Sequence, residues 1–213
     1  MEGKAECYFF PHFKRMPSFE RDVHATFCPL TQGLPYYIRT AFGTDDSLIL
    51  RPILDFHDGF GAGLQAMTEV AARLGFKPAE AARAWADAAA RQEACWREGR
   101  EIGRKAIDEA KRTGKLVIVL FGRPYNALTS TLNMSVPRKF ATRGYSVLPF
   151  DFLPTGGEAI YPNMYWYYGQ QNMKGAMMVK GDPDLYPCYI TNFSCAPDSF
   201  ILHYLRWINN TKP

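Results

Sequence analysis

The second half of the chain alternates short apolar runs with longer segments whose apolar positions have helical spacing. Short runs with almost no polar residue are typical of strands buried on both faces of a sheet. Strands that alternate with helices predict a parallel sheet, so we expect a Rossmann-like arrangement here. The predicted strands are 115–121, 145–149 and 186–190, and the predicted helices are 133–143, 163–180 and 200–207.

The first half is less regular. It contains a predicted strand at 6–10, a helix at 32–41, a short apolar run at 48–50 and a helix at 64–74. The glycine-rich segment 59–63 precedes the second helix. We interpret it as a hinge or a helix entry rather than a phosphate loop, because no strand feeds it in a dinucleotide-binding register.

Residues 78–113 are predicted to form one long helix. Pro78 suits the first helical position, and no proline follows it within the segment. Pairs at spacing four, Glu101 with Lys105 and Asp108 with Arg112, are expected on its surface. One helix face is formed by Trp85, Ala89, Gln92, Trp96, Gly99, Gly103, Ala106 and Ala110. The glycines and alanines on this face allow a neighbouring segment to approach closely.

These patterns together predict an α/β fold with Rossmann-like parallel sheets in two subdomains joined by a long helix. The first subdomain is expected to cover 1–77 and to carry Cys28. The connecting helix covers 78–113, and the second subdomain covers 114–213 and carries Cys195.

Composition narrows the class of protein. The chain is 47% hydrophobic and 15% aromatic, which is typical of a folded globular protein. Its net charge of +4 comes from basic residues interleaved with acids, so we expect no nucleic-acid partner. No apolar stretch approaches the ~20 residues that span a bilayer, and no signal-peptide core is present. We therefore expect a cytoplasmic protein, without a membrane partner, whose five cysteines are free thiols or metal ligands.

Three predicted loops follow the strands of the second half, at 122–130, 151–158 and 191–197. The carboxyl ends of parallel strands meet at one edge, so these loops are expected to line a common crevice. The alternative is ordinary turn chemistry, because Gly, Pro, Asn and Asp favour turns in any protein. Candidate site residues in or next to these loops include Arg123, Tyr125, Asn126, Asp151, Asn192, Cys195 and Asp198.

Two cysteines differ from the other three. Cys28 and Cys195 each open a turn beside a proline, just before a predicted helix, where the helix dipole favours the thiolate form that binds metals. Their separation matches no zinc or ferredoxin spacing. Cys7, Cys95 and Cys188 are interpreted as small apolar packing residues.

Four sequence blocks resemble a known family. They are 28–35 (CPLTQGLP), 122–126 (GRPYN), 164–170 (MYWYYGQ) and 192–200 (NFSCAPDSF). The chain is similar in these blocks to the DUF2229 region of acyl-CoA dehydratase activase-related proteins. These proteins are relatives of the iron–sulfur subunits of 2-hydroxyacyl-CoA (2-hydroxyglutaryl-CoA) dehydratases and of double-cubane-cluster proteins.

The resemblance implies a low-potential electron-transfer system that depends on an ATP-hydrolysing activase, in another protein or in the same polypeptide. It implies an iron–sulfur cluster, of the 4Fe-4S or double-cubane type, with Cys28 and Cys195 as ligands. An acyl-CoA is the implied substrate. Asn192 is implied as a residue that helps to bind the cluster. Arg123, Tyr125 and Asn126 would lie around the cluster or contact substrate.

Family members carry a further cysteine upstream of residue 6 and a further segment after the Cys195 block. The resemblance therefore implies a fragment truncated at both ends, with cluster ligands missing from this chain. The alternative function, which stays open, is a non-redox α/β scaffold or a degenerate fragment that docks an activase.

Overall fold

The computed structural model describes residues 5–17, 24–156, 161–192 and 195–210. It confirms an α/β fold with parallel sheets. The chain forms two compact units: the first comprises residues 1–92 with 165–167, and the second comprises 93–164 with 168–213. The predicted boundaries near 77 and 113 stay predictions.

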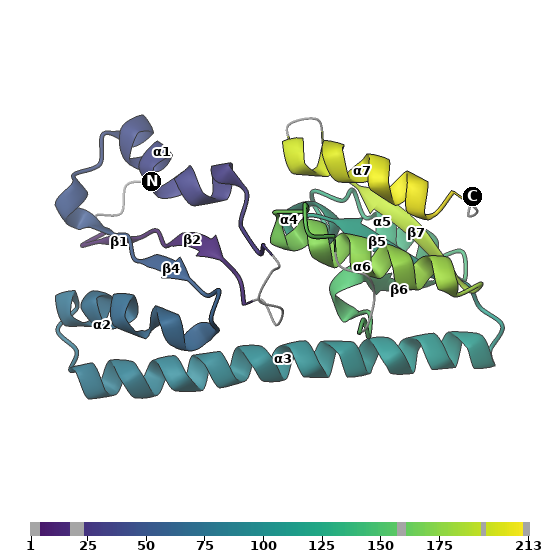
Figure 1. Ribbon diagram of the computed structural model, residues 1–213, viewed down its shortest axis with the longest axis horizontal. Helices are drawn as coiled ribbons and strands as arrows, with labels where there is room; N and C mark the ends of the chain where they lie inside the picture. Colours follow the sequence, from purple (N-terminus) through teal and green to yellow (C-terminus); the bar gives the residue numbers. More distant parts are fainter. Residues whose placement is uncertain (1–4, 18–23, 157–160, 193–194, 211–213) are drawn as a thin grey trace. The chain divides into compact units, whose positions relative to one another are not determined.

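The first unit contains two short pairs of parallel strands (Figure 1), and two prolines lie between the pairs. Tyr8 pairs with Ile49 and His12 pairs with Ile53, so the register is the same on both sides of the prolines. In this register Pro11 and Pro52 lie opposite each other, and neither has an N–H to donate. The two pairs are β1 (Tyr8–Phe9) with β3 (Ile49–Leu50) and β2 (His12–Arg15) with β4 (Ile53–Asp55).

Backbone hydrogen bonds continue past the prolines. Phe10 N–H donates to the Leu50 carbonyl and His12 N–H donates to the Pro52 carbonyl, both at 2.9 Å. Only one strand, at 6–10, is predicted in this region, so β2 and β4 differ from the prediction. Both strands contain polar residues and follow a proline, so neither appears in the sequence as a continuous apolar run.

The helices of the first unit match the predicted segments closely. α1 (Pro29–Phe42) begins three residues earlier than predicted. Segment 60–63 forms a short 3-10 helix that leads into α2 (Leu64–Arg73), so it is a helix entry as expected. Gly75 ends α2 in a left-handed conformation at φ +86°, with Phe76 N–H donating to the Ala71 carbonyl.

α3 (Pro78–Arg112) is continuous, as predicted. Its small-residue face is used: Gly103 is buried, and a Cβ there would overlap the carbonyl oxygen of Phe152. The expected pair of Glu101 with Lys105 forms at 3.6 Å. The expected pair of Asp108 with Arg112 is absent from the ion pairs of the described residues, and Arg112 binds the neighbouring Glu109 instead.

The sheet of the second unit has the order β6–β5–β7, with all strands parallel. Its strands agree with the predicted ones to within about two residues. The helices agree less well, because α4 was not expected and α7 begins four residues before its predicted start. α5 begins three residues after its predicted start, and α6 begins four residues after its predicted start. The elements are β5 (Val117–Gly122), α4 (Pro124–Ala127), α5 (Val136–Ala141), β6 (Ser146–Pro149), α6 (Tyr167–Gly181), β7 (Leu185–Ile190) and α7 (Ala196–Ile208).

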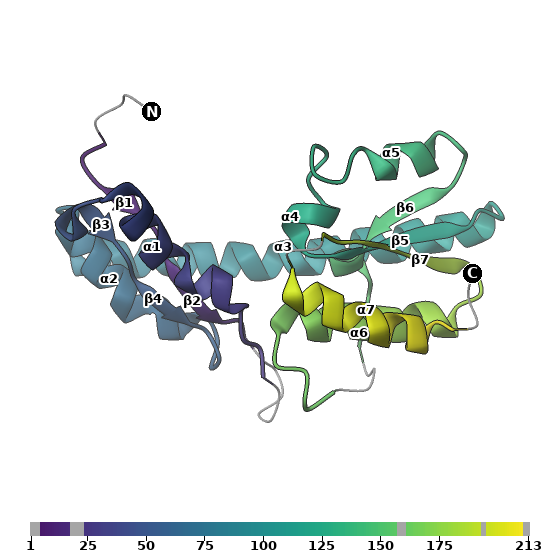
Figure 2. The ribbon, with the colours of Figure 1, turned by 90° about the horizontal axis from the view of Figure 1, so that it is seen from above.

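β5 is the centre of the second unit and is buried along its whole length. Phe121 projects from it toward Gly175 of α6 and toward Leu205 of α7, so both helices cover the same face. α5 lies on the opposite face (Figure 2). The main core lies on the Phe121 face and contains Ile107, Ala110, Val117, Val119, Phe121, Leu148, Phe150, Leu153, Val179 and Leu185.

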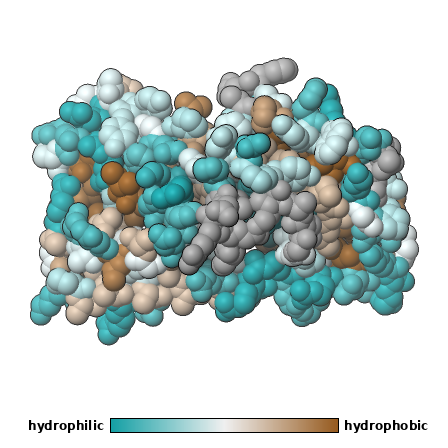
Figure 3. All heavy atoms as spheres, in the orientation of Figure 1, coloured by the Kyte–Doolittle hydropathy of each residue, from teal (hydrophilic) through white to brown (hydrophobic). Residues whose placement is uncertain are grey.

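On the face shown in Figure 3, polar side chains divide the hydrophobic residues into separate patches. None of the described helices is both long enough and apolar enough to cross a membrane.

Candidate functional site

The central position of β5 decides where a crevice forms. The chain leaves β5 for β6 on one side and later reaches β7 on the other side, so the loops after β5 and β7 diverge. Polar side chains from these two loops meet, since Asn192 Nδ2 donates to Asn126 Oδ1 at 3.4 Å. We call this place the β5–β7 crevice. The third predicted loop packs inward instead: Phe152 lies against α3 and Leu153 lies against α6.

Gly122 ends β5 in a conformation that favours glycine. Its φ is +136°, and a Cβ would overlap the carbonyl oxygen of Ile190 on β7. Its N–H donates to Oδ1 of Asn172 at 3.1 Å, and Asn172 Nδ2 donates in turn to the Tyr168 carbonyl at 2.6 Å. Asn172 is not among the sequence-predicted site residues, because a polar residue within a predicted helix gives no local sign that its side chain becomes buried.

Arg123 follows directly and is unusual for a cation. Only 4% of its surface is exposed. Its guanidinium lies 5.2 Å from the ring centroid of Tyr168. Among the described residues, no carboxylate lies within ion-pair distance of Arg123. Its charge nevertheless lowers the pKa of Asp198.

Asn126 lies three residues further on, in the short helix α4. It is 5% exposed, and its backbone N–H donates to the Arg123 carbonyl at 2.9 Å. Its Oδ1 accepts from Asn192, whereas its Nδ2 is buried with no hydrogen-bond partner among the described residues. The amide therefore has one unused donor at the crevice.

Cys195 lies on the other side of the crevice, at the N-cap of α7. It is 7% exposed, and burial raises the pKa of its thiol. The backbone N–H of Asp198 and the hydroxyl of Tyr125 lower that pKa, and the Asp198 carboxylate raises it. Burial also raises the pKa of Tyr125, to about 12. The thiol is thus favoured as the neutral form unless a cation stabilises the thiolate.

Asp198 is the buried carboxylate of this site. It is 0% exposed, and its Oδ2 accepts from the Thr191 hydroxyl at 3.2 Å. Its Oδ1 has no hydrogen-bond partner in the part of the chain that the structure describes. Burial raises the pKa of Asp198, while contact with Cys195 and the charge of Arg123 lower it.

Cys28 has a closely similar position in the first unit. It is the N-cap of α1 and is 7% exposed, and its Sγ lies 3.7 Å from the Thr31 hydroxyl. Because Cys28 and Cys195 belong to different units, a site shared by them stays a prediction. All five cysteines are free. The expectation that Cys95 packs as a small apolar residue is wrong, since it is exposed on α3.

Within the described residues, no group of three or more His, Cys, Asp or Glu side chains is placed to hold a metal ion.

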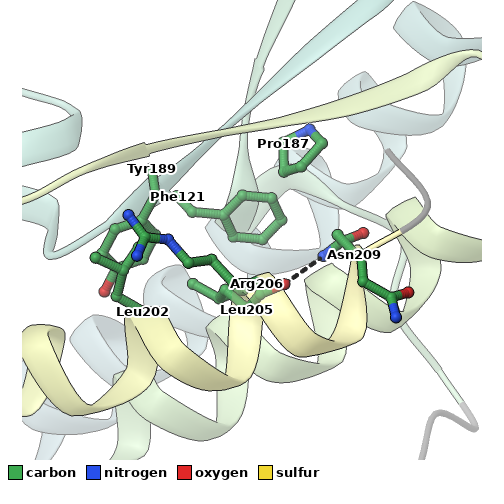
Figure 4. Close-up of a pocket in the computed structure, with 8 residues that line it drawn as sticks. Phe121, Pro187, Tyr189, Leu202, Leu205, Arg206 and Asn209 are labelled. Atoms are coloured by element: carbon green, nitrogen blue, oxygen red, sulfur yellow. Dashed lines mark hydrogen bonds between the residues drawn. The ribbon is translucent and has the colours of Figure 1, made fainter. Parts of the chain in front are cut away.

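A hollow with a volume of about 230 Å³ lies between the sheet and α7. Figure 4 shows Phe121 and Pro187 from the sheet facing Leu205 of α7 and Asn209, which directly follows α7. Asn209 Nδ2 donates to the Leu205 carbonyl at 3.3 Å, and its Oδ1 has no partner among the described residues. This hollow is mainly apolar, so it suits packing better than polar chemistry.

Comparison with known proteins gives one result. The model of the family described as CoA enzyme activase uncharacterised domain (DUF2229) matches residues 1–153. The chain belongs to this family. No curated protein matches it, and no solved structure matches it.

The range of the family match divides the candidate residues. Cys28 lies inside the matched range, and so do Arg123, Tyr125 and Asn126. Asn192 and Cys195 lie beyond residue 153. Family membership links the chain to a CoA enzyme activase system.

Proposed function

We propose that this DUF2229 chain is an iron–sulfur cluster-binding module of a 2-hydroxyacyl-CoA dehydratase-like electron-transfer system that depends on an ATP-hydrolysing activase. Membership of the family supports the link to an activase. The iron–sulfur assignment is supported by the matching environments of Cys28 and Cys195.

The observation that carries the proposal is that each cysteine stands at the N-cap position of a helix without the side-chain hydrogen bond that an N-cap residue normally makes. N-caps are normally Ser, Thr, Asp or Asn, whose side chains accept a backbone hydrogen bond. Neither cysteine meets the geometry of a side-chain capping hydrogen bond, although the Asp198 N–H lies close enough to the Cys195 sulfur to lower its pKa. A proline stands in the first turn of each helix. The cysteine carbonyl accepts the first helical bond in both cases, at 3.1 Å. The thiols are therefore not explained by capping.

The environment of each thiol suits a metal ligand. A helix N-terminus stabilises negative charge on sulfur, and a metal ion favours the thiolate that burial alone disfavours. Tyr125 and the backbone N–H of Asp198 adjoin Cys195 and would stabilise charge on its sulfur. A cluster held by such thiolates supplies one-electron transfer at low potential.

The other residues have separate tasks. Asn192 orients Asn126 across the β5–β7 crevice, and Arg123 supplies positive charge to this crevice. ATP hydrolysis belongs to the activase partner, since the loop at 122–126 lacks the glycine and lysine pattern of a phosphate loop. The acyl-CoA substrate is part of the same proposal.

A second candidate is a non-redox α/β scaffold that docks an activase. One observation favours it: the described residues contain no cluster of three or more metal-binding side chains. In that case Cys28 and Cys195 are structural thiols.

Anaerobic reconstitution with iron and sulfide separates the two candidates. We expect the wild-type chain to take up iron and acid-labile sulfide, and Cys28→Ala and Cys195→Ala each to lower the iron content at least twofold. Cys95→Ala is the matched control, because Cys95 is exposed on α3 and should leave iron uptake unchanged. A wild-type chain without iron, or full iron content in both Cys28→Ala and Cys195→Ala, would show the scaffold to be correct.

A further inference from the structure

The charge of Arg123 has no carboxylate partner among the described residues. A buried guanidinium is strongly unfavourable unless a carboxylate or another acceptor satisfies it. Arg123 is 4% exposed, and its contact within the described residues is the face of the Tyr168 ring. A ring face accepts part of the charge, but it offers no acceptor to the N–H donors that lie in the plane of the guanidinium.

A second unused donor lies within the same turn. Asn126 is 5% exposed, and Asn192 holds its Oδ1, so the orientation of its amide is defined. The Nδ2 of this amide is buried and has no partner among the described residues. Two buried donor groups, one of them charged, thus flank one turn at the carboxyl end of β5.

Asp198 does not satisfy these donors. Its carboxylate lies beyond ion-pair distance from Arg123, and it contacts Thr191 and Cys195. Its negative charge still acts on the crevice, and this favours a ligand of low charge.

We propose that Arg123 and Asn126 bind a compact oxyanion, a carboxylate or a phosphate group, in the β5–β7 crevice. A guanidinium offers parallel N–H donors that match both groups, and the amide supplies a third donor. The carboxyl ends of β5 and β7 are the place where open α/β sheets bind ligands. A singly charged carboxylate fits beside Asp198 better than a doubly charged phosphate.

This oxyanion site goes beyond the proposed function, because it involves neither thiol and needs no cluster. The two assignments can fail separately. Cys195→Ser should lose iron and keep anion binding, whereas Arg123 and Asn126 variants should lose anion binding.

The test titrates the 213-residue chain with sodium propionate and, separately, with sodium phosphate, and follows binding by calorimetry and by NMR chemical shifts. Sodium chloride at matched ionic strength is the reference. We expect propionate to bind more tightly than phosphate. Arg123→Gln should weaken propionate binding at least tenfold, because it removes charge-assisted hydrogen bonds.

Asn126→Asp keeps the acceptor for Asn192 and replaces the unused donor by a negative oxygen. It should also weaken binding at least tenfold and should fold, since the Nδ2 that it removes makes no bond among the described residues. Arg138→Gln, on the exposed surface of α5, removes the same charge elsewhere and should bind like wild type.

Each result decides the proposal. Tighter binding of phosphate supports the oxyanion site and assigns it to phosphate. The proposal is overturned if the wild-type chain binds propionate and phosphate no more tightly than chloride. It is also overturned if a folded Asn126→Asp chain binds propionate as tightly as the wild-type chain does. If Arg123→Gln does not fold, Asn126→Asp alone decides.

Discussion

At the scale of single residues, Asp55 shows how one carboxylate stabilises the β2–β4 strand pair of the first unit. Arg15 donates two hydrogen bonds to it, from Nε at 2.7 Å and from Nη2 at 2.6 Å. Lys14 lies 3.2 Å away. These partners, with Arg15 first, lower the pKa of Asp55 from 3.8 to about 2. The pairing coincides with the register shift between Phe13 and Arg15, so it holds the strand where the ladder is irregular.

The lowered pKa predicts how the pair depends on pH. Because the folded-state pKa of Asp55 lies below the unfolded value of 3.8, its stabilisation is present above that value and is lost as pH falls toward 2. We expect Asp55→Asn to lower the free energy of unfolding by about 1 kcal/mol near pH 7, since the pair is partly exposed and screened.

Urea denaturation measured from about pH 7 down to about pH 2 checks this prediction. The variant should lose less stability than wild type over the acid part of this range. Glu101→Gln is the control, because the side chains of its ion pairs on α3 are about half exposed or more. An Asp55→Asn chain as sensitive to acid as wild type would contradict the assignment.

At the scale of elements, α3 depends on glycine where it crosses Phe152. A Cβ at Gly103 would overlap the backbone carbonyl of Phe152, which cannot move aside without shifting the segment after β6. A Cβ at Gly99 would lie 3.3 Å from the Phe152 ring, which is a side chain and can rotate. The two glycines lie one turn apart on the same helix face and form a matched pair.

We expect Gly103→Ala to lower the free energy of unfolding by about 2 kcal/mol, as overpacking against a fixed group does. Gly99→Ala should be neutral or stabilising by up to about 1 kcal/mol, because alanine is the better helix former. Chemical denaturation of both variants checks the difference. Equal effects at the two positions would show that α3 does not approach Phe152 closely.

Some strands and helices could be predicted from the sequence and others could not. The apolar run that became β5 was predicted to within two residues, because burial on both faces demands a continuous apolar sequence. β2 and β4 were missed, because they are short and contain polar residues such as His12 and Asp55. α4 was missed, because a single turn such as Pro124–Ala127 is too short to show helical periodicity.

At the scale of the whole molecule, the division into two compact units predicts separate local stability. Asp55 lies in the first unit and Gly103 in the second. Elements that share a core open together, so a substitution should raise hydrogen exchange mainly within its own unit. We expect Gly103→Ala to raise exchange in β5, β6 and β7 and to leave α1 and β4 unchanged. Asp55→Asn should have the opposite pattern.

Hydrogen exchange followed by mass spectrometry resolves these segments and checks the prediction. Wild type measured under the same conditions provides the reference rates. Equal increases across both units for either variant would show that the chain opens as one cooperative body.

The sequence by itself determined the α/β class, the long helix and the order of strands and helices in the second unit. It also indicated Cys28, Cys195 and the loop at 122–126, because turns beside prolines and at strand ends are local features. Only the tertiary structure decided that β5 is central, that Asn192 meets Asn126, and that Arg123 is buried beside Tyr168. These facts depend on strand order and on which side chains become buried together, and both are set by contacts between residues far apart in the chain.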